Sequence, residues 1–158
     1  MVIGDFADVR IEGRFSLVFV VFNTFFGLLS QEDQVRCFSG VARHLTDDGA
    51  FVIEAFVPDP SRFDRRQRVA ALDVDADFAE LGVSVHDPVR QQIVSQHVVC
   101  SDQGVRLYPV QVRYAWPSEL DLMARLAGLR LQARHGGWAG EPFTAASNSH
   151  ISVYEPIR

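Results

Sequence analysis

The 158-residue chain contains no lysine, and all 15 of its basic residues are arginine. Lysine is therefore excluded as a Schiff base or a general base. Acidic residues number 20, so the formal net charge is −5 at pH 7. Because the arginines are scattered among acidic residues, the chain lacks the basic surface of a protein that binds nucleic acid or an anionic membrane.

Cysteine is also scarce. Cys37 and Cys100 lie far apart and form no C-x-x-C pattern, so the sequence predicts neither a disulfide framework nor a zinc site. Small thiols in a reducing cytosol are the simpler interpretation. The histidines show no metal-ligand spacing, and no G-x-S-x-G motif is present. A metal centre and a serine hydrolase site are not predicted.

Long hydrophobic runs are missing as well. The most apolar stretch, residues 15–29, is too short to span a membrane and is interrupted by Asn23, Thr24 and Gly27. The first residues show neither the basic nor the apolar region of a signal peptide. We therefore predict a cytoplasmic protein without a membrane partner.

The residues that are present predict an α/β domain. An apolar fraction of 47% over this length is sufficient for one domain with a core. The continuous apolar run at residues 15–22 indicates a strand buried on both faces of a parallel sheet. Ser30 begins a helix over residues 31–45, which the Asp47-Asp48-Gly49 turn ends, and residues 50–56 form the next interior strand. Such a strand–helix–strand unit returns a parallel neighbour.

A different pattern follows. Residues 61–67 are charged and predict a short exposed turn or helix. Apolar and polar residues alternate from position 69 to position 114, which is typical of antiparallel strands. In particular, residues 93–100 and 105–114 are predicted to pair through the turn at 102–104.

The last third of the chain predicts a helix and two strands. Pro117 begins a helix that Gly128 ends. Residues 129–134 and 150–154 form strands on either side of a long loop that contains glycine and tryptophan. The sheet is therefore expected to close with an antiparallel hairpin.

The opening Val2-Ile3-Gly4-Asp5-Phe6 has the pattern of a strand that ends in a turn. It is followed by no glycine-rich turn of the kind that holds the cofactor in dinucleotide-binding α/β folds. The sole double glycine, Gly136-Gly137, precedes Trp138 and not a helix.

The order of these segments resembles that of the class I S-adenosylmethionine-dependent methyltransferases. Gly4-Asp5-Phe6 is similar to the family's loop after the third strand, residues 15–24 to the fourth strand with its turn, and residues 49–54 to the fifth strand. Residues 116–131 resemble the fifth helix and sixth strand, and residues 150–155 resemble the seventh strand.

The resemblance implies a partial Rossmann-like sheet, mixed and with an antiparallel last strand. It also implies one truncated domain over residues 1–158, with an antiparallel insertion at about residues 61–115. The family's first two strands, its glycine-rich loop and the acid that binds the ribose have no counterpart, so the chain corresponds to the carboxyl-terminal portion.

By the same resemblance the cofactor is S-adenosylmethionine. Asp5 would accept a hydrogen bond from the adenine amino group, Phe6 would contact the ring, and the turn formed by Phe22, Asn23 and Thr24 would flank the methyl donor. The residues alone leave alternatives open: a turn aspartate, a core phenylalanine, and turn or capping roles for Asn23 and Thr24.

Two further interpretations concern polar side chains outside these turns. Glu54 lies within a buried strand, so its carboxylate must be paired or must lie near the strand's exit. Tyr108, His135 and Trp138 are candidates to line a substrate cavity, although the sequence favours the interpretation as a surface loop.

The expected function is methyl transfer to a small molecule, active only when a missing amino-terminal segment completes the chain. No catalytic residue is predicted, because methyl transfer needs mainly proximity and in-line alignment. The alternatives are a non-catalytic remnant, which could form a homodimer through its sheet edge or its antiparallel section, and a module that binds a small ligand. Whether the chain alone is an enzyme stays open.

Overall fold

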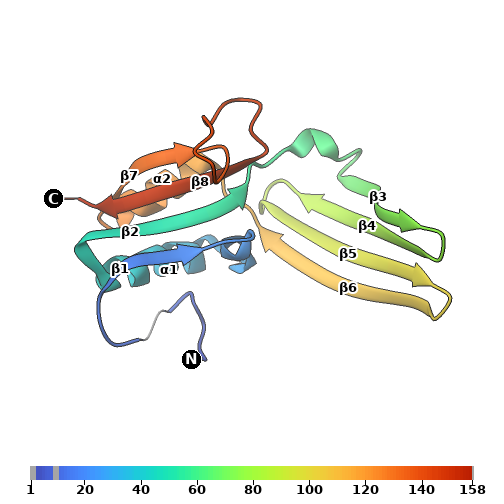
Figure 1. Cartoon of the computed structure of the whole chain (residues 1–158), viewed down its shortest axis with the longest axis horizontal. Coiled ribbons are helices and arrows are strands. Elements are labelled where there is room, and N and C mark those ends of the chain that lie inside the picture. The colour runs from blue at the N-terminus through green and yellow to red at the C-terminus, as the bar shows by residue number, and fades with distance from the viewer. Residues whose placement is uncertain (1–2, 9–10, 158) are drawn as a thin grey trace. The chain divides into compact units, whose positions relative to one another are not determined.

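The computed structural model describes residues 3–8 and 11–157 (Figure 1). The chain divides into two compact units. One unit runs up to Pro58 and resumes at Ala115, and the other is Asp59–Tyr114.

The first unit contains a four-stranded mixed sheet. In sequence its strands are β1 (Phe15–Val20), β2 (Leu45–Phe56), β7 (Leu129–His135) and β8 (Ser149–Pro156), and their order in the sheet is β1-β2-β8-β7. The pair β1–β2 is parallel, whereas β8 is antiparallel to both β2 and β7. The predicted α/β class, with an antiparallel last strand, is confirmed.

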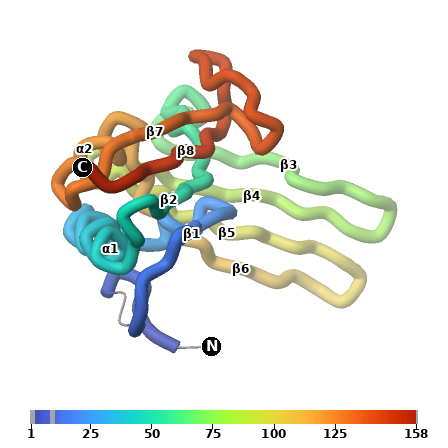
Figure 2. Tube along the Cα trace, turned by 60° about the vertical axis from the view of Figure 1, so that its left-hand side comes forward, coloured from blue at the N-terminus to red at the C-terminus, as the bar shows by residue number. Residues whose placement is uncertain are grey.

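Two α-helices and a short 3₁₀ helix accompany this sheet: η1 (Thr24–Gly27), α1 (Gln31–His44) and α2 (Pro117–Leu126). The Ser30 hydroxyl caps α1 by accepting a hydrogen bond from the backbone N–H of Asp33 at 3.0 Å. Figure 2 shows α1 and α2 together on one side of the strands, and the two helices contact each other.

An aromatic cluster fixes α1 on the sheet. The Phe38 ring packs edge-to-face against Phe25, Phe51 and Tyr154, with ring centroids 5.3 to 5.5 Å apart. All four rings are buried. Edge-to-face pairs of this kind stabilise a core beyond the area that they bury, so this cluster is the centre of the first unit.

The prediction that residues 15–22 are buried on both faces is wrong. Leu17 and Phe19 are 53% and 63% exposed. In the described part of the chain β1 has one neighbouring strand, β2, and the helices cover one face of the sheet. Leu17 and Phe19 alternate with Val18, whose partner Phe51 faces α1, so they lie on the opposite face.

The end of α1 also differs from the prediction. The helix stops at His44, and β2 already begins at Leu45, which pairs with Phe15. The next pairs join Leu17 to Ala50, so the predicted turn at Asp47-Asp48-Gly49 is a bulge inside the strand. A Cβ atom on Gly49 would lie 2.9 Å from the carbonyl oxygen of Phe15, which explains why glycine stands there.

The predicted strand end at the start of the chain is not seen. Val2 lies outside the described residues, and Ile3 belongs to no strand and is exposed.

The second unit is an antiparallel meander. After the 3₁₀ turn η2 (Pro60–Arg62), strands β3 (Gln67–Asp75), β4 (Phe78–Asp87), β5 (Gln92–Ser101) and β6 (Gly104–Arg113) pair in sequence order. The predicted pairing through residues 102–104 is confirmed. The turn between β3 and β4 was not predicted.

The register separates the two faces of this meander. One face, here called the apolar face, carries no charged side chain over four rows of cross-strand neighbours. The rows are Gln67–Val85–Val94–Gln111, Val69–Val83–Gln96–Pro109, Ala71–Leu81–Val98–Leu107 and Val74–Ala79–Cys100–Val105.

The opposite face of the meander is mixed. The hydroxyls of Ser84 and Ser95 are 2.8 Å apart there, and Glu80 forms an ion pair with His97 at 2.6 Å. Ile93, Val99 and Val110 share this face with them, so the two faces differ in charge and not in the presence of apolar side chains.

We expect Gly49→Ala to lower the free energy of unfolding by about 1–3 kcal/mol, because the new methyl group meets backbone atoms that cannot yield easily. Urea denaturation would measure this change. Gly27→Ala is the matched control, since a Cβ at Gly27 meets nothing within 4 Å. Equal stability of the two variants would contradict this account of the bulge.

Candidate functional site

The turn after β1 has an unusual backbone. Phe22 and Asn23 both adopt left-handed conformations, with φ of 58° and 60°. Such angles are uncommon for residues other than glycine, and asparagine tolerates them better than phenylalanine does. The backbone N–H of Thr24 donates to the carbonyl oxygen of Val21 at 3.1 Å, and Thr24 begins η1. Two consecutive left-handed residues need support from neighbouring groups.

The end of β2 supplies that support. The Glu54 carboxylate accepts a hydrogen bond from the N–H of Phe22 at 3.0 Å, and the Asn23 side-chain oxygen accepts one from the N–H of Phe56 at 2.7 Å. The expectation that Glu54 is paired near the strand's exit is confirmed. These bonds hold the carboxyl ends of the two parallel strands together and leave the Phe22 ring 82% exposed.

Asp5 and Phe6 lie in a different turn. The Asp5 carboxylate accepts from the N–H of Ala7 at 2.9 Å, and its carbonyl oxygen accepts from the N–H of Asp8 at 3.1 Å. Burial, reinforced by the negative charge of Asp5, raises the pKa of the Cys37 thiol in α1 to about 12. The turn therefore lies beside α1. Phe6 is exposed, which does not fit a place in the core.

The structure thus brings three of the five predicted cofactor residues, Phe22, Asn23 and Thr24, into one turn. The other candidates remain scattered. Tyr108 lies on β6 in the second unit, and both Tyr108 and Trp138 are exposed. His135 ends β7 and forms a β-bridge with Pro142. The exposure of Trp138 agrees with the interpretation of its segment as a surface loop.

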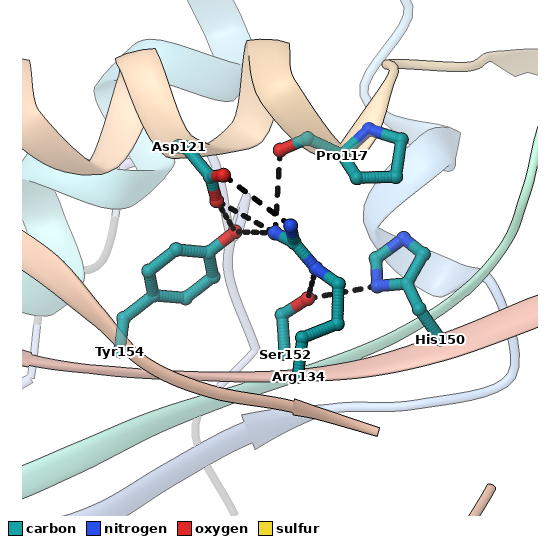
Figure 3. Close-up of polar contacts among 6 residues, drawn as sticks. All are labelled: Pro117, Asp121, Arg134, His150, Ser152 and Tyr154. Atoms are coloured by element: carbon teal, nitrogen blue, oxygen red, sulfur yellow. Dashed lines mark hydrogen bonds and ion pairs between the residues drawn. The ribbon is translucent and has the colours of Figure 1, made fainter. Parts of the chain in front are cut away.

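A polar cluster that the sequence did not predict lies between α2 and the sheet (Figure 3). It consists of Asp121, Arg134, His150, Ser152 and Tyr154. The Arg134 guanidinium donates to the Asp121 carboxylate at 2.6 Å, and the Tyr154 hydroxyl donates to the same oxygen at 2.9 Å. Three elements, α2, β7 and β8, are joined through this cluster.

Hydrogen bonding within the cluster leaves one ring nitrogen of His150 without a partner. The Ser152 hydroxyl oxygen accepts from Nε of Arg134 at 2.8 Å and lies 2.8 Å from Nδ1 of His150. Because a hydroxyl both donates and accepts, this contact is compatible with either tautomer of the neutral ring. The other ring nitrogen, Nε2, is buried and has no hydrogen-bond partner among the described residues.

Burial sets the charges of the cluster. Burial and the nearby Arg134 cation lower the pKa of His150 to about 4, so its imidazole is neutral at pH 7. Burial and the Asp121 charge raise the pKa of Tyr154, so its hydroxyl stays protonated. The cluster is therefore one ion pair, Asp121–Arg134, with three neutral partners, an arrangement suited to fixing β7 and β8 against α2.

The sequence holds a signal for this cluster. His150, Ser152 and Tyr154 alternate with Ile151 and Val153, so all three point to one face of the final strand. Because α2 covers that face, polar residues there must find partners.

The described residues contain no group of three or more histidine, cysteine, aspartate or glutamate side chains that could hold a metal ion. In the same part of the chain, no helix is both long enough and apolar enough to cross a bilayer.

Comparison with known proteins gives a consistent picture. No family model matches the chain. The cypemycin N-terminal methyltransferase of Streptomyces sp is 33% identical over 155 residues, which are 96% of this chain and 62% of that protein. The structure of the CcbJ methyltransferase from Streptomyces caelestis is 38% identical with a TM-score of 0.94, covering 99% of this chain and 63% of CcbJ.

A more distant structure shares the fold alone. It is an S-adenosylmethionine-dependent methyltransferase from Clostridium acetobutylicum, 9% identical with a TM-score of 0.82, covering 98% of this chain and 63% of that one. This chain thus spans less than two thirds of the length of each of these proteins.

Asn23→Ala removes the acceptor for the N–H of Phe56. We expect it to lower the free energy of unfolding by about 1–3 kcal/mol, because a strand-end donor loses its partner and alanine tolerates the left-handed backbone poorly. Asn23→Asp keeps a side-chain oxygen that accepts from the N–H of Phe56, and aspartate tolerates the left-handed backbone better than alanine does. This variant should therefore lower the free energy of unfolding by less than Asn23→Ala. Thermal unfolding of both variants would measure the difference, and equal losses would contradict the role given to the side-chain oxygen.

The buried neutral His150 predicts a pH dependence. Its pKa is lower in the folded chain than the ordinary 6.5, so the unfolded chain binds more protons between pH 6.5 and about 4. Stability should therefore fall as the pH drops through this window, by up to about 1.4 kcal/mol per pH unit from this group. His150→Gln should show a shallower decline in denaturant titrations at each pH, and parallel curves would contradict the assignment.

Proposed function

Because this chain belongs to the class I S-adenosylmethionine-dependent methyltransferases, we propose that it contributes the methyl-donor side of a site that methylates a small molecule. A nitrogen or oxygen atom of the acceptor would attack the methyl carbon. The carbon–sulfur bond would break with its electron pair left on sulfur, which gives S-adenosylhomocysteine, and the acceptor would lose a proton.

The turn formed by Phe22, Asn23 and Thr24 carries this proposal. It stands at the carboxyl end of β1, next to the end of the parallel strand β2. Ligands of open α/β sheets bind at this edge. We assign the exposed Phe22 ring and the polar groups of Asn23 and Thr24 to contacts with S-adenosylmethionine, Asp5 to the adenine amino group, and Phe6 to the adenine ring.

Binding would require a further segment. Neither β1 nor β2 leads into a glycine-rich turn, the element that lets a backbone approach such a cofactor closely. The face of β1 opposite α1 exposes Leu17 and Phe19, as expected if further elements cover it in the active protein. The relatives are longer than this chain. Their greater length agrees with an additional amino-terminal segment that supplies the glycine-rich turn and the elements that cover β1.

This proposal treats residues 1–158 as one methyltransferase-like domain with an insertion at about residues 61–115. The compact unit Asp59–Tyr114 supports the placement of the insertion.

A second candidate function is a non-catalytic α/β domain that associates with itself. The exposed side chains on the apolar face of the second unit favour it, because a stable monomer rarely leaves so large an uncharged surface in water. Self-association would use the second unit, so it does not depend on whether the first unit takes part in methyl transfer.

Calorimetry with S-adenosylhomocysteine tests the first candidate. We expect no binding by the chain alone at high micromolar ligand. Binding should appear when the part of CcbJ that this chain does not match is fused ahead of it. In the fusion, Asp5→Ala should weaken binding about tenfold through loss of one charge-assisted hydrogen bond.

The control variant is Asp8→Ala in the same fusion, which should bind as the parent does, because Asp8 pairs with Arg36 and has no role assigned at the site. Binding by the chain alone would contradict the need for completion while supporting the cofactor. A folded fusion that does not bind would overturn the methyl-transfer proposal and favour the second candidate.

A further inference from the structure

Glu80 and His97 form a pair on the mixed face of the β3–β6 meander, and the methyl-donor site uses neither residue. His97 on β5 stands opposite Gly82 on β4, and Glu80 precedes Gly82 by two residues, so the pair is diagonal across the two strands. The Glu80 carboxylate oxygen Oε1 lies 2.6 Å from Nδ1 of His97. We propose that this pair is the polar part of a binding site for a neutral small molecule that carries a hydroxyl or amine proton.

The Glu80 carboxylate decides which ring nitrogen of His97 is available. An ionised carboxylate can only accept a hydrogen bond, so the short contact requires a proton on Nδ1. In the neutral ring the lone pair then lies on Nε2. Among the described residues, Nε2 of His97 has no hydrogen-bond partner. The pair therefore presents an acceptor whose direction is fixed from the opposite side of the ring.

The pair is accessible but partly withdrawn from water. The side chains of His97 and Glu80 are 41% and 26% exposed. A ligand can therefore reach the imidazole, while most of the Glu80 side chain is covered. The exposure separates His97 from His150, whose unpartnered ring nitrogen is buried.

Apolar side chains stand on both sides of His97. A Cβ atom on Gly82 would lie 3.2 Å from a methyl carbon of Leu72, so the Leu72 side chain lies over Gly82 on this face. Tyr108 on β6 is the other cross-strand neighbour of His97. Leu72 and Tyr108 are 47% and 50% exposed. One oriented acceptor between an aliphatic and an aromatic side chain has the composition of a small-molecule site.

The charges around His97 favour a neutral ligand. The next row of cross-strand neighbours on one side carries Arg68, and the row on the other side carries Asp73, Glu80 and Arg106. Positive and negative side chains thus balance, so an ion of either sign would meet both attraction and repulsion. A hydroxyl or neutral amine needs only an acceptor, which Nε2 supplies.

An ion pair that only stabilises the sheet is the alternative. Such a pair has the same geometry and binds nothing. Two probes of nearly the same shape separate the two explanations. 4-Methylphenol has a proton to donate to Nε2, whereas its methyl ether has none.

Nuclear magnetic resonance of the whole chain with nitrogen-15-labelled histidine tests the site. The measurement uses a mildly alkaline pH, at which an ordinary imidazole is neutral and a phenol is not yet ionised. We expect 4-methylphenol to shift the Nε2 resonance of His97 in a saturable way, with a dissociation constant in the millimolar range. The ether should bind at least about tenfold more weakly, because one hydrogen bond is lost.

Glu80→Gln and Asp73→Asn form a matched pair of variants, since Asp73 and Glu80 are cross-strand partners and each change removes one negative charge. Glu80→Gln should weaken the binding of 4-methylphenol at least about tenfold, because a neutral amide holds the Nδ1 proton less strongly than a carboxylate does. Asp73→Asn leaves the contact with His97 intact and should change the binding less than about threefold. Both variants conserve shape and should keep the circular dichroism of the wild type.

Equal binding of 4-methylphenol and its ether would overturn the inference, because apolar contact alone would then explain it. The absence of a saturable shift in the wild-type chain would also overturn it, and so would equal effects of Glu80→Gln and Asp73→Asn. These measurements need no cofactor and concern the second unit alone. Their outcome is therefore independent of whether the chain or its fusion binds S-adenosylhomocysteine.

Discussion

The carboxyl ends of β1 and β2 are held together by side chains that bond to backbone, and the candidate site depends on this contact. Glu54 accepts from the turn after β1, while Asn23 in that turn accepts from the end of β2. Each strand thus fixes the other, and two consecutive left-handed residues become acceptable. Without these bonds the turn would lose the backbone path that presents Phe22, Asn23 and Thr24 at the edge of the sheet.

Most of the architecture could be predicted from sequence because the signals are local. The apolar run at residues 15–20, the capped helix after Ser30 and the alternation along β5 and β6 each report directly on an element. The burial of β1 could not be predicted in this way. A continuous apolar run shows that a strand suits an interior, but whether other elements cover it depends on the rest of the fold.

The same limit applies to the site. The polar residues after an apolar strand predicted the position of the turn, since ligands of α/β sheets bind at that edge. The bond between Asn23 and Phe56 joins positions 33 residues apart, and no local pattern reveals it. The cluster around Arg134 was missed for a related reason: its members come from α2, β7 and β8, and only the packed helix brings Asp121 to the arginine.

The strand order has a consequence for synthesis and folding. The centre of the first sheet pairs Phe51 of β2 with Tyr154 of β8, so it forms only after nearly the whole described chain has left the ribosome. The meander between them is built from sequential hairpins with short loops, which close quickly because little chain entropy is lost. A nascent chain would therefore carry a folded hairpin array while β1, α1 and β2 still await their last partner, and its exposed valines would then be most open to chaperones.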